Sequence, residues 1–256
     1  MIKKITLMIL AAVFSGTVLA ENWTTVRIGV EGAYPPFSQT NADGSITGFD
    51  IDIANALCAE IGAKCTMVAQ DWDGMIPALL AHKYDAIIAS MSITEERKKV
   101  VAFTDKYYSA PARFIKKTRD PNLKIFNSLM KGLKVGVQRE TAMDRFLTDN
   151  WKDIVEIRHY NTQEDANNDL LTNRLDLLFA EVGPGDDFIK THPEKAEFVG
   201  PTYTDERWFG EGIGIAIRKQ DNDLRKQLNN AIAKIRADGT YNRIQKQYFD
   251  FDIYGE

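Results

Sequence analysis

The sequence predicts an α/β protein made of two lobes that two chain segments connect. From residue 26 onward, short apolar runs rich in β-branched residues alternate with runs of helical periodicity, which favours parallel strands covered by helices. This pattern stops at residues 107–111, restarts at residue 133, and returns late through residues 199–217. We therefore assign residues 21–109 and 206–256 to lobe 1 and residues 110–205 to lobe 2.

The first twenty residues have the organisation of a signal peptide. Lys3 and Lys4 precede an apolar run over residues 5–19, and the small-residue site at 18–20 comes just before Glu21. The run is too short to span a membrane as a helix. We expect residues 1–20 to be cleaved and the mature protein to be exported.

Composition excludes several classes of function. The chain has 256 residues with a net charge of −4, so it lacks the basic excess typical of nucleic-acid-binding proteins. Its three histidines are scattered, and neither an H-E-x-x-H nor a G-x-S-x-G motif is present. Gly210, Gly212 and Gly214 precede strand residues and not a helix, which argues against a dinucleotide loop. We expect no catalytic residues, no metal and no cofactor.

In lobe 1 the first strand covers residues 26–30, followed by a loop over 31–37. A helix over 50–61 carries its apolar residues on one stripe, and Gly62 is placed to end it. A strand follows at 64–70. Residues 71–74 open a second helix, in which Pro77 is tolerated near the first turn.

Cys58 and Cys65 are the only cysteines in the chain. In an exported protein a close pair of this kind is most often a disulfide. Such a bridge would tie the end of the 50–61 helix to the start of the next strand.

The segment over residues 84–97 gives the strongest local indication of a binding site. A buried strand over 84–88 leads into the turn Ser90–Ser92, and Thr94 is placed to cap a short helix. Arg97 then occupies the position where a capping box has Glu or Gln, and its charge opposes the helix dipole by roughly 0.3–1 kcal/mol. A residue that is locally unfavourable for the helix, placed at the carboxyl end of a strand, indicates a ligand-binding site. A guanidinium beside serine hydroxyls is suited to binding a carboxylate. The alternative is a surface ion pair between Arg97 and Glu96 or another neighbour.

In lobe 2 and the return segment the periodicity continues. It predicts strands at 133–137, 155–160, 175–180 and 212–217, helices at 142–150, 162–173 and 221–248, and a loop at 181–185.

Several motifs together resemble a known family. They are Gly48-Phe49-Asp50-Ile51-Asp52, Ser90-x-Ser92-Ile93-Thr94-x-x-Arg97, Phe103-Thr104-Asp105-x-Tyr107-Tyr108, Phe209-Gly210-x-Gly212-x-Gly214 and Asp238-Gly239-Thr240-Tyr241. Over essentially the whole mature chain, the sequence resembles the periplasmic solute-binding proteins (family 3) of polar amino-acid ABC importers, in the lysine/arginine/ornithine- and histidine-binding branch. The resemblance implies a type II periplasmic binding fold, in which two Rossmann-like lobes joined by two hinge strands close around one ligand. It also implies a monomer that delivers its ligand to membrane permease subunits.

The resemblance also assigns roles in the site. Arg97 would hold the ligand α-carboxylate with Ser92, Thr141 and Ala142, while Ser90 and Glu181 would hold the α-ammonium. Glu31 would meet a cationic side-chain head, and Tyr34 and Trp72 would enclose the aliphatic stem. Ala89 and Met91 complete the expected set, with Ala89 near the side-chain head. The expected ligand is a cationic L-amino acid: arginine, lysine, ornithine or histidine.

The sequence departs from the pattern of its nearest branch at four positions. Glu31 and Glu181 stand where aspartate is usual, Ala89 replaces a serine, and Ala142 replaces a threonine. Since opine-binding relatives also carry Glu-Gly at the position of Glu31 and Gly32, an opine or another polar amino acid is the alternative ligand. A dehydratase on the same fold is a further alternative, with Glu31 or Glu181 as the acid.

Overall fold

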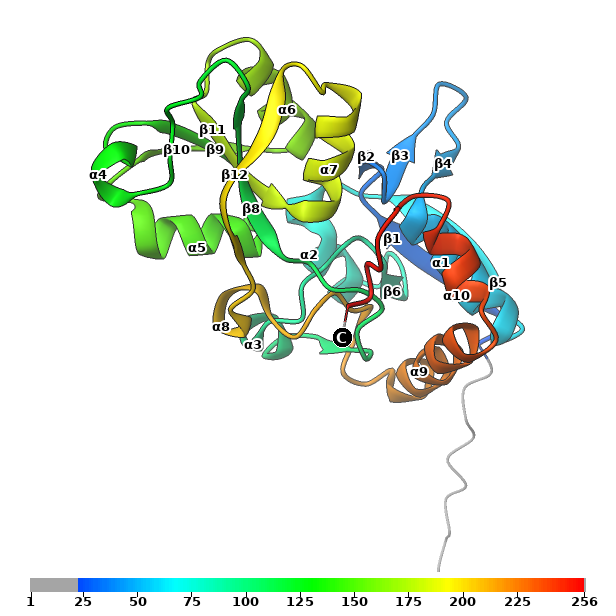
Figure 1. Cartoon of the computed structure of the whole chain (residues 1–256). Coiled ribbons are helices and arrows are strands. Elements are labelled where there is room, and N and C mark those ends of the chain that lie inside the picture. Colours follow the sequence, from blue (N-terminus) through cyan, green and yellow to red (C-terminus); the bar gives the residue numbers. More distant parts are fainter. Residues whose placement is uncertain (1–22, 256) are drawn as a thin grey trace, which may run out of the picture.

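The computed structural model describes residues 23–255, so the predicted signal peptide lies outside the described residues. Two five-stranded sheets with their helices form the two lobes. In Figure 1 the green and yellow elements of lobe 2 lie beside the blue, orange and red elements of lobe 1. Within the described range, no helix is both long enough and apolar enough to cross a membrane.

The lobe 1 sheet has the strand order β5-β1-β6-β13-β7. Its strand β1 (Thr25–Val30) pairs in parallel with β5 (Lys64–Ala69) and β6 (Ala86–Ile87). Strand β13 (Ala216–Ile217) runs antiparallel to β6 and to β7 (Ala102–Phe103). The returning chain therefore adds a strand of opposite direction to the predicted parallel layer.

Other elements complete lobe 1. A small antiparallel sheet joins the short strands β2 (Ala33–Tyr34), β3 (Ser38–Thr40) and β4 (Ile46–Thr47). The helical elements are α1 (Phe49–Glu60), the 3₁₀ turn η1 (Trp72–Gly74), α2 (Met75–Leu80), α3 (Glu95–Lys98), α9 (Asn222–Ala237) and α10 (Thr240–Gln245). The last helices, predicted over 221–248, are α9 and α10, and Gly239 between them takes a φ of 81°. As predicted, Gly62 adopts a left-handed conformation, with a φ of 69°, just beyond the end of α1.

The lobe 2 sheet has the order β10-β9-β11-β8-β12. Its strands are β8 (Ala112–Lys117), β9 (Lys134–Gln138), β10 (Glu156–Tyr160), β11 (Leu177–Glu181) and β12 (Ala196–Tyr203). Its helices are α4 (Asn127–Met130), α5 (Ala142–Trp151), α6 (Gln163–Leu171) and α7 (Val182–Thr191). The predicted loop over 181–185 is wrong, because α7 begins at Val182. Asp176, predicted to lie inside a strand, precedes β11 and accepts a hydrogen bond from the Lys134 amide at 2.8 Å.

Two chain segments cross between the lobes, the first before β8 and the second after β12. They meet in an antiparallel bridge between Tyr108 and Ile213. The second segment contains α8 (Glu206–Phe209), whose Phe209 ring lies 5.4 Å from that of Phe146 in lobe 2. The boundary at residue 206 stays a prediction, and this contact shows that α8 packs on lobe 2.

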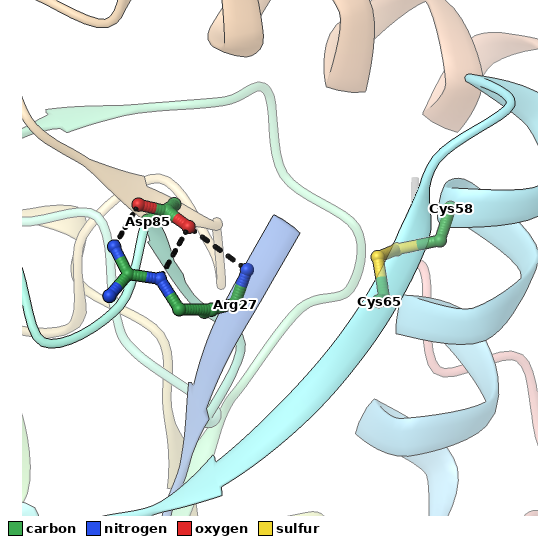
Figure 2. The surroundings of a disulfide bond; sticks show 4 residues. All are labelled: Arg27, Cys58, Cys65 and Asp85. Atoms are coloured by element: carbon green, nitrogen blue, oxygen red, sulfur yellow. Dashed lines mark hydrogen bonds and ion pairs between the residues drawn. A yellow bond between two sulfur atoms is a disulfide. The ribbon is translucent and has the colours of Figure 1, made fainter. Parts of the chain in front are cut away.

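The predicted disulfide between Cys58 and Cys65 is present and joins the end of α1 to β5 (Figure 2), with 6.1 Å between the two Cα atoms. The two cysteines are only 7 positions apart. By loop-closure entropy, a bridge over so short a loop stabilises the fold by about 2–3 kcal/mol.

We expect the double variant Cys58→Ser/Cys65→Ser to fold and to lose stability by about that amount. Urea unfolding of the oxidised protein and of the variant measures the difference. Treatment of the wild type with reductant should cause the same loss of stability. Equal stabilities would mean that packing alone holds the end of α1 on β5.

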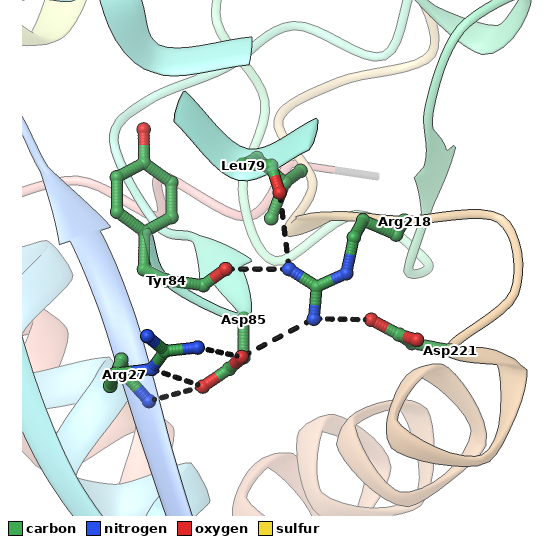
Figure 3. Close-up of polar contacts among 6 residues, drawn as sticks. All are labelled: Arg27, Leu79, Tyr84, Asp85, Arg218 and Asp221. Carbon is green, nitrogen blue, oxygen red and sulfur yellow. Dashed lines mark hydrogen bonds and ion pairs between the residues drawn. The ribbon is translucent and has the colours of Figure 1, made fainter. Parts of the chain in front are cut away.

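A cluster of polar side chains connects several elements of lobe 1 (Figure 3). The Arg218 side chain is 3% exposed and donates to the carbonyl oxygens of Leu79 at 3.1 Å and Tyr84 at 2.6 Å. It also pairs with Asp85 at 3.2 Å and Asp221 at 2.6 Å. Arg27 on β1 binds Asp85 from the other side through its backbone and its guanidinium, as Figures 2 and 3 show. The cluster therefore ties β1, α2 and the start of α9 to the residue that enters β6.

Candidate functional site

One cavity lies between the lobes, and it brings together ten of the eleven predicted site residues. Its lining consists of Glu31, Tyr34, Trp72, Ala89, Ser90, Ser92, Arg97, Thr141, Ala142 and Glu181, together with Gln138 and Met143. Most of these residues follow the carboxyl ends of strands β1, β6, β9 and β11, which is the usual position for a ligand in such sheets.

The eleventh residue, Met91, lines an adjoining cavity that shares Trp72, Arg97, Thr141 and Ala142 with the first. Its side chain is buried and packs among the apolar residues between α2 and β6. Two lining residues, Gln138 and Met143, were not predicted from the sequence.

Arg97 is held in place by its own turn. Thr94 caps α3 as predicted, accepting a hydrogen bond from the Arg97 amide at 3.3 Å. The guanidinium donates to the carbonyl oxygens of Ser92 at 3.0 Å and Glu140 at 3.1 Å, and it lies 5.2 Å from the centre of the Trp72 ring. Burial, with the nearby charge of Arg145, lowers the Arg97 pKa to about 10, so the group stays charged at neutral pH.

The alternative of a surface pair between Arg97 and Glu96 is wrong. Glu96 pairs instead with Arg145 of α5, and in the range 23–255 Arg97 forms no ion pair with a carboxylate. Its charge is therefore available to an anion in the cavity.

Glu181 ends β11 and is 3% exposed. Within the described part of the chain, its Oε2 atom has no hydrogen-bond partner. Burial raises the Glu181 pKa to about 8, and the nearby Asp50 adds to this, while Arg97 and Tyr34 act in the opposite direction. A buried carboxylate of this kind is a ready partner for a cationic group.

Glu31 follows β1, is half-buried and lines the cavity from lobe 1. Its Oε1 accepts a hydrogen bond of 2.6 Å from Gln138 Nε2 across the two lobes. Burial raises the Glu31 pKa to about 7, and the charges of Asp71 and Asp50 contribute in the same direction.

Asp50, in the first turn of α1, positions Ser90 from behind the cavity. Its Oδ2 accepts hydrogen bonds from the Ser90 amide at 2.9 Å and the Ser90 hydroxyl at 3.1 Å, and its Oδ1 accepts one from the Tyr107 hydroxyl at 2.8 Å. These bonds hold Ser90 at a φ of 53°, a conformation uncommon for residues other than glycine. Burial raises the Asp50 pKa to about 7.

The charges around the cavity are unbalanced. Glu31 and Glu181 line it and Asp50 holds Ser90 beside it, while Arg97 is the single cationic side chain among the described residues of the lining. A ligand with one carboxylate and two positive groups would complete this arrangement. In the described residues no cluster of three or more potential metal ligands occurs.

The carboxylate pKa values predict proton release on binding. Glu31 and Glu181 are largely protonated below their pKa values of about 7 and 8, and a cation pairs only with the charged forms. Affinity for a dicationic ligand should therefore rise with pH between about 6 and 8.5, by up to tenfold per unit for each carboxylate.

Calorimetric titrations in two buffers of different ionisation enthalpy measure the number of protons released. At pH 7 we expect a difference between the two heats, which should shrink in Glu31→Gln. An affinity that stays constant from pH 6 to 8.5 would contradict this linkage.

Among the described residues, four polar contacts join the lobes around the cavity. They are Gln138 to Glu31, Arg97 to the Glu140 carbonyl, and the ion pairs Arg139–Asp73 and Arg145–Glu96.

Comparison with known proteins identifies the relatives of this chain. Residues 26–251 match the model of the bacterial extracellular solute-binding proteins, family 3. The L-arginine-binding protein of Pseudomonas aeruginosa is 49% identical over 90% of each chain. The histidine-binding periplasmic protein of Salmonella typhimurium is 42% identical over 90% of this chain and 89% of its own.

A solved structure shares the same fold. It is the structure of a periplasmic binding protein of Salmonella typhimurium with high arginine specificity. Its TM-score is 0.81 at 33% identity, over 88% of this chain and 99% of that one.

Proposed function

Since the chain belongs to the family 3 bacterial extracellular solute-binding proteins, we propose that it is a periplasmic receptor for a cationic L-amino acid. Arginine, lysine and ornithine are the favoured ligands, with histidine also in the class. In this proposal the monomeric protein closes on its ligand and delivers it to the permease subunits of an ABC importer. It binds the ligand and does not convert it.

The observation that carries this proposal is the unbalanced charge of the interlobe cavity. Arg97 suits the α-carboxylate, Glu181 with Ser90 suits the α-ammonium, and Glu31 suits a second positive group at the far end of the side chain. An amino acid with a neutral side chain would leave Glu31 unmatched. The names of the relatives, which bind arginine and histidine, support the same class.

Aromatic groups suit the aliphatic part of such a ligand. Tyr34 is 5% exposed and Trp72 is half-buried, and both line the cavity. Aromatic faces attract the methylene groups and the cationic head of a long side chain.

A thermal-shift screen of the twenty amino acids, ornithine, citrulline and opines tests the proposal. Binding at a thousandfold excess over Kd stabilises the folded state by about 4 kcal/mol, so a true ligand gives a large shift. We expect large shifts with arginine, lysine or ornithine. Shifts confined to acidic or apolar amino acids would overturn the proposed ligand class.

The same samples test the absence of turnover. The ligand recovered after long incubation should be chemically unchanged. Its conversion would place the protein among the enzymes that use this fold.

A further inference from the structure

We propose that Gln138 is a specificity-determining residue that favours a guanidinium over an ammonium group at the end of the ligand side chain. This inference rests on the proposed function and narrows its ligand class to arginine.

Contacts within the protein hold the Gln138 side chain in place. It ends β9 in lobe 2, is 3% exposed and lines the cavity. Its Nε2 donates to Glu31 Oε1 at 2.6 Å and to the Asn161 carbonyl at 3.1 Å. Both amide hydrogens are thereby used, so the orientation of the side-chain amide is determined.

This arrangement leaves two acceptor atoms free. Among residues 23–255 no hydrogen bond reaches Gln138 Oε1, and none reaches Glu31 Oε2. The two atoms belong to side chains that are tied together by a hydrogen bond but come from opposite lobes. Glu31 Oε2 is a charged acceptor and Gln138 Oε1 is a neutral one. The distance between them depends on how the two lobes are placed relative to each other.

A guanidinium matches a pair of acceptors better than an ammonium does. Its five N–H donors lie in one plane as a rigid fork, so two of them can reach two neighbouring acceptors at once. The ammonium of lysine or ornithine is a compact charge on a flexible stem and obtains most of its stabilisation from one carboxylate. Gln138 Oε1 should therefore add more to arginine binding than to lysine binding.

The bond between Gln138 and Glu31 also restricts how the carboxylate can bind. Because Glu31 Oε1 already accepts from Gln138, a guanidinium cannot take both carboxylate oxygens without competing for that bond. The fork is thus directed to Glu31 Oε2 and Gln138 Oε1, and the head group contacts both lobes.

The variant Gln138→Leu tests this role, because it retains approximate volume and removes the amide. Calorimetric titration with arginine and with lysine should show arginine affinity lowered at least tenfold and lysine affinity changed less than threefold. Gln138→Asn keeps the amide but is shorter by one methylene group, so it should also lower the preference for arginine. It serves as the second variant if the leucine variant does not fold.

Gln163→Leu is the matched control. Gln163 is also in lobe 2 and 4% exposed, but it bonds to Asn167 and lies outside the lining of the cavity. Its substitution should leave the ratio of arginine to lysine affinity unchanged.

The outcomes separate this inference from the proposed function. Equal losses for arginine and lysine in Gln138→Leu, or wild-type protein that binds lysine as tightly as arginine, would overturn the role of Gln138 and leave the receptor intact. Wild-type protein that binds no cationic amino acid would overturn both.

Discussion

Replacing Arg97 with alanine should reduce the affinity for every amino-acid ligand by at least 100-fold. Removing one member of a buried charge pair costs about 3–5 kcal/mol, and 1.4 kcal/mol corresponds to a tenfold change in Kd. Arg97→Lys should restore little, because an ammonium cannot make the paired contacts of a guanidinium with a carboxylate. Calorimetric titration with arginine, lysine and a neutral amino acid measures the loss.

Arg145→Ala provides the control for this prediction. Arg145 lies in the same cleft and its side chain is 36% exposed, but it pairs with Glu96 and lies outside the lining of the site cavity. Its removal should change affinity by only a few-fold. If Arg97→Ala also stayed within a few-fold of wild type, Arg97 would have no role in holding the ligand.

Glu31→Gln should weaken arginine and lysine by about 3–5 kcal/mol while leaving citrulline binding nearly unchanged. Citrulline has the shape of arginine without its charge, so it isolates the contribution of the Glu31 carboxylate. The measured quantity is the ratio of arginine to citrulline affinity in wild type and variant. We expect this ratio to fall by about 100-fold or more.

Glu140→Gln is the matched control, because the Glu140 side chain is exposed and its hydrogen bond with Arg97 is made by its backbone carbonyl. Equal weakening of arginine and citrulline in Glu31→Gln would mean that Glu31 only shapes the cavity. No weakening at all would remove the main support for a cationic ligand.

Much of the fold could be predicted because its periodicity is local. The helices near 50–61 and 142–150, and the strands between them, carry their apolar residues at the spacing of their own element. The turn at Thr94 could also be predicted from its local sequence. There, Arg97 departs from the capping-box pattern, and this departure indicated a binding site.

The start of α7 could not be predicted in this way. Gly183, Pro184 and Gly185 look like a loop, since glycine and proline interrupt regular structure. Pro184 is tolerated because the first amides of a helix have no partner within it. The two glycines are explained by distant contacts: a Cβ at Gly183 would lie 2.7 Å from the Phe37 ring, and one at Gly185 would lie 2.9 Å from Ile115.

Strand β8 was missed for a related reason. Its sequence ends in Lys116 and Lys117, which suggests an exposed segment, but both side chains are buried. Lys117 donates to the Leu175 carbonyl at 2.7 Å and Lys116 pairs with Glu197 at 2.9 Å, so each ammonium group has a partner far along the chain. Asp120 contacts both lysines from nearby in the sequence.

Gln138 was likewise not predicted as a site residue, because its role depends on partners that are distant in the sequence. A glutamine at the end of a strand carries no local sign of a role, and its partner Glu31 is 107 positions away. Asp50 was part of a recognised motif, but its bonds to Ser90 depend on how α1 meets the end of β6. The sequence thus indicated the charged groups of the site, and only the fold indicated which residues position them.

We expect the polar contacts between the lobes to affect the rate of ligand exchange. Parting of the lobes must separate the Arg139–Asp73 and Arg145–Glu96 pairs, so these pairs should slow the release of a ligand that leaves by lobe opening. Both pairs are partly exposed to solvent, and added salt screens such pairs. Ionic strength should therefore act mainly on the rate of release, while the carboxylates and Arg97 inside the cavity determine which ligand is retained.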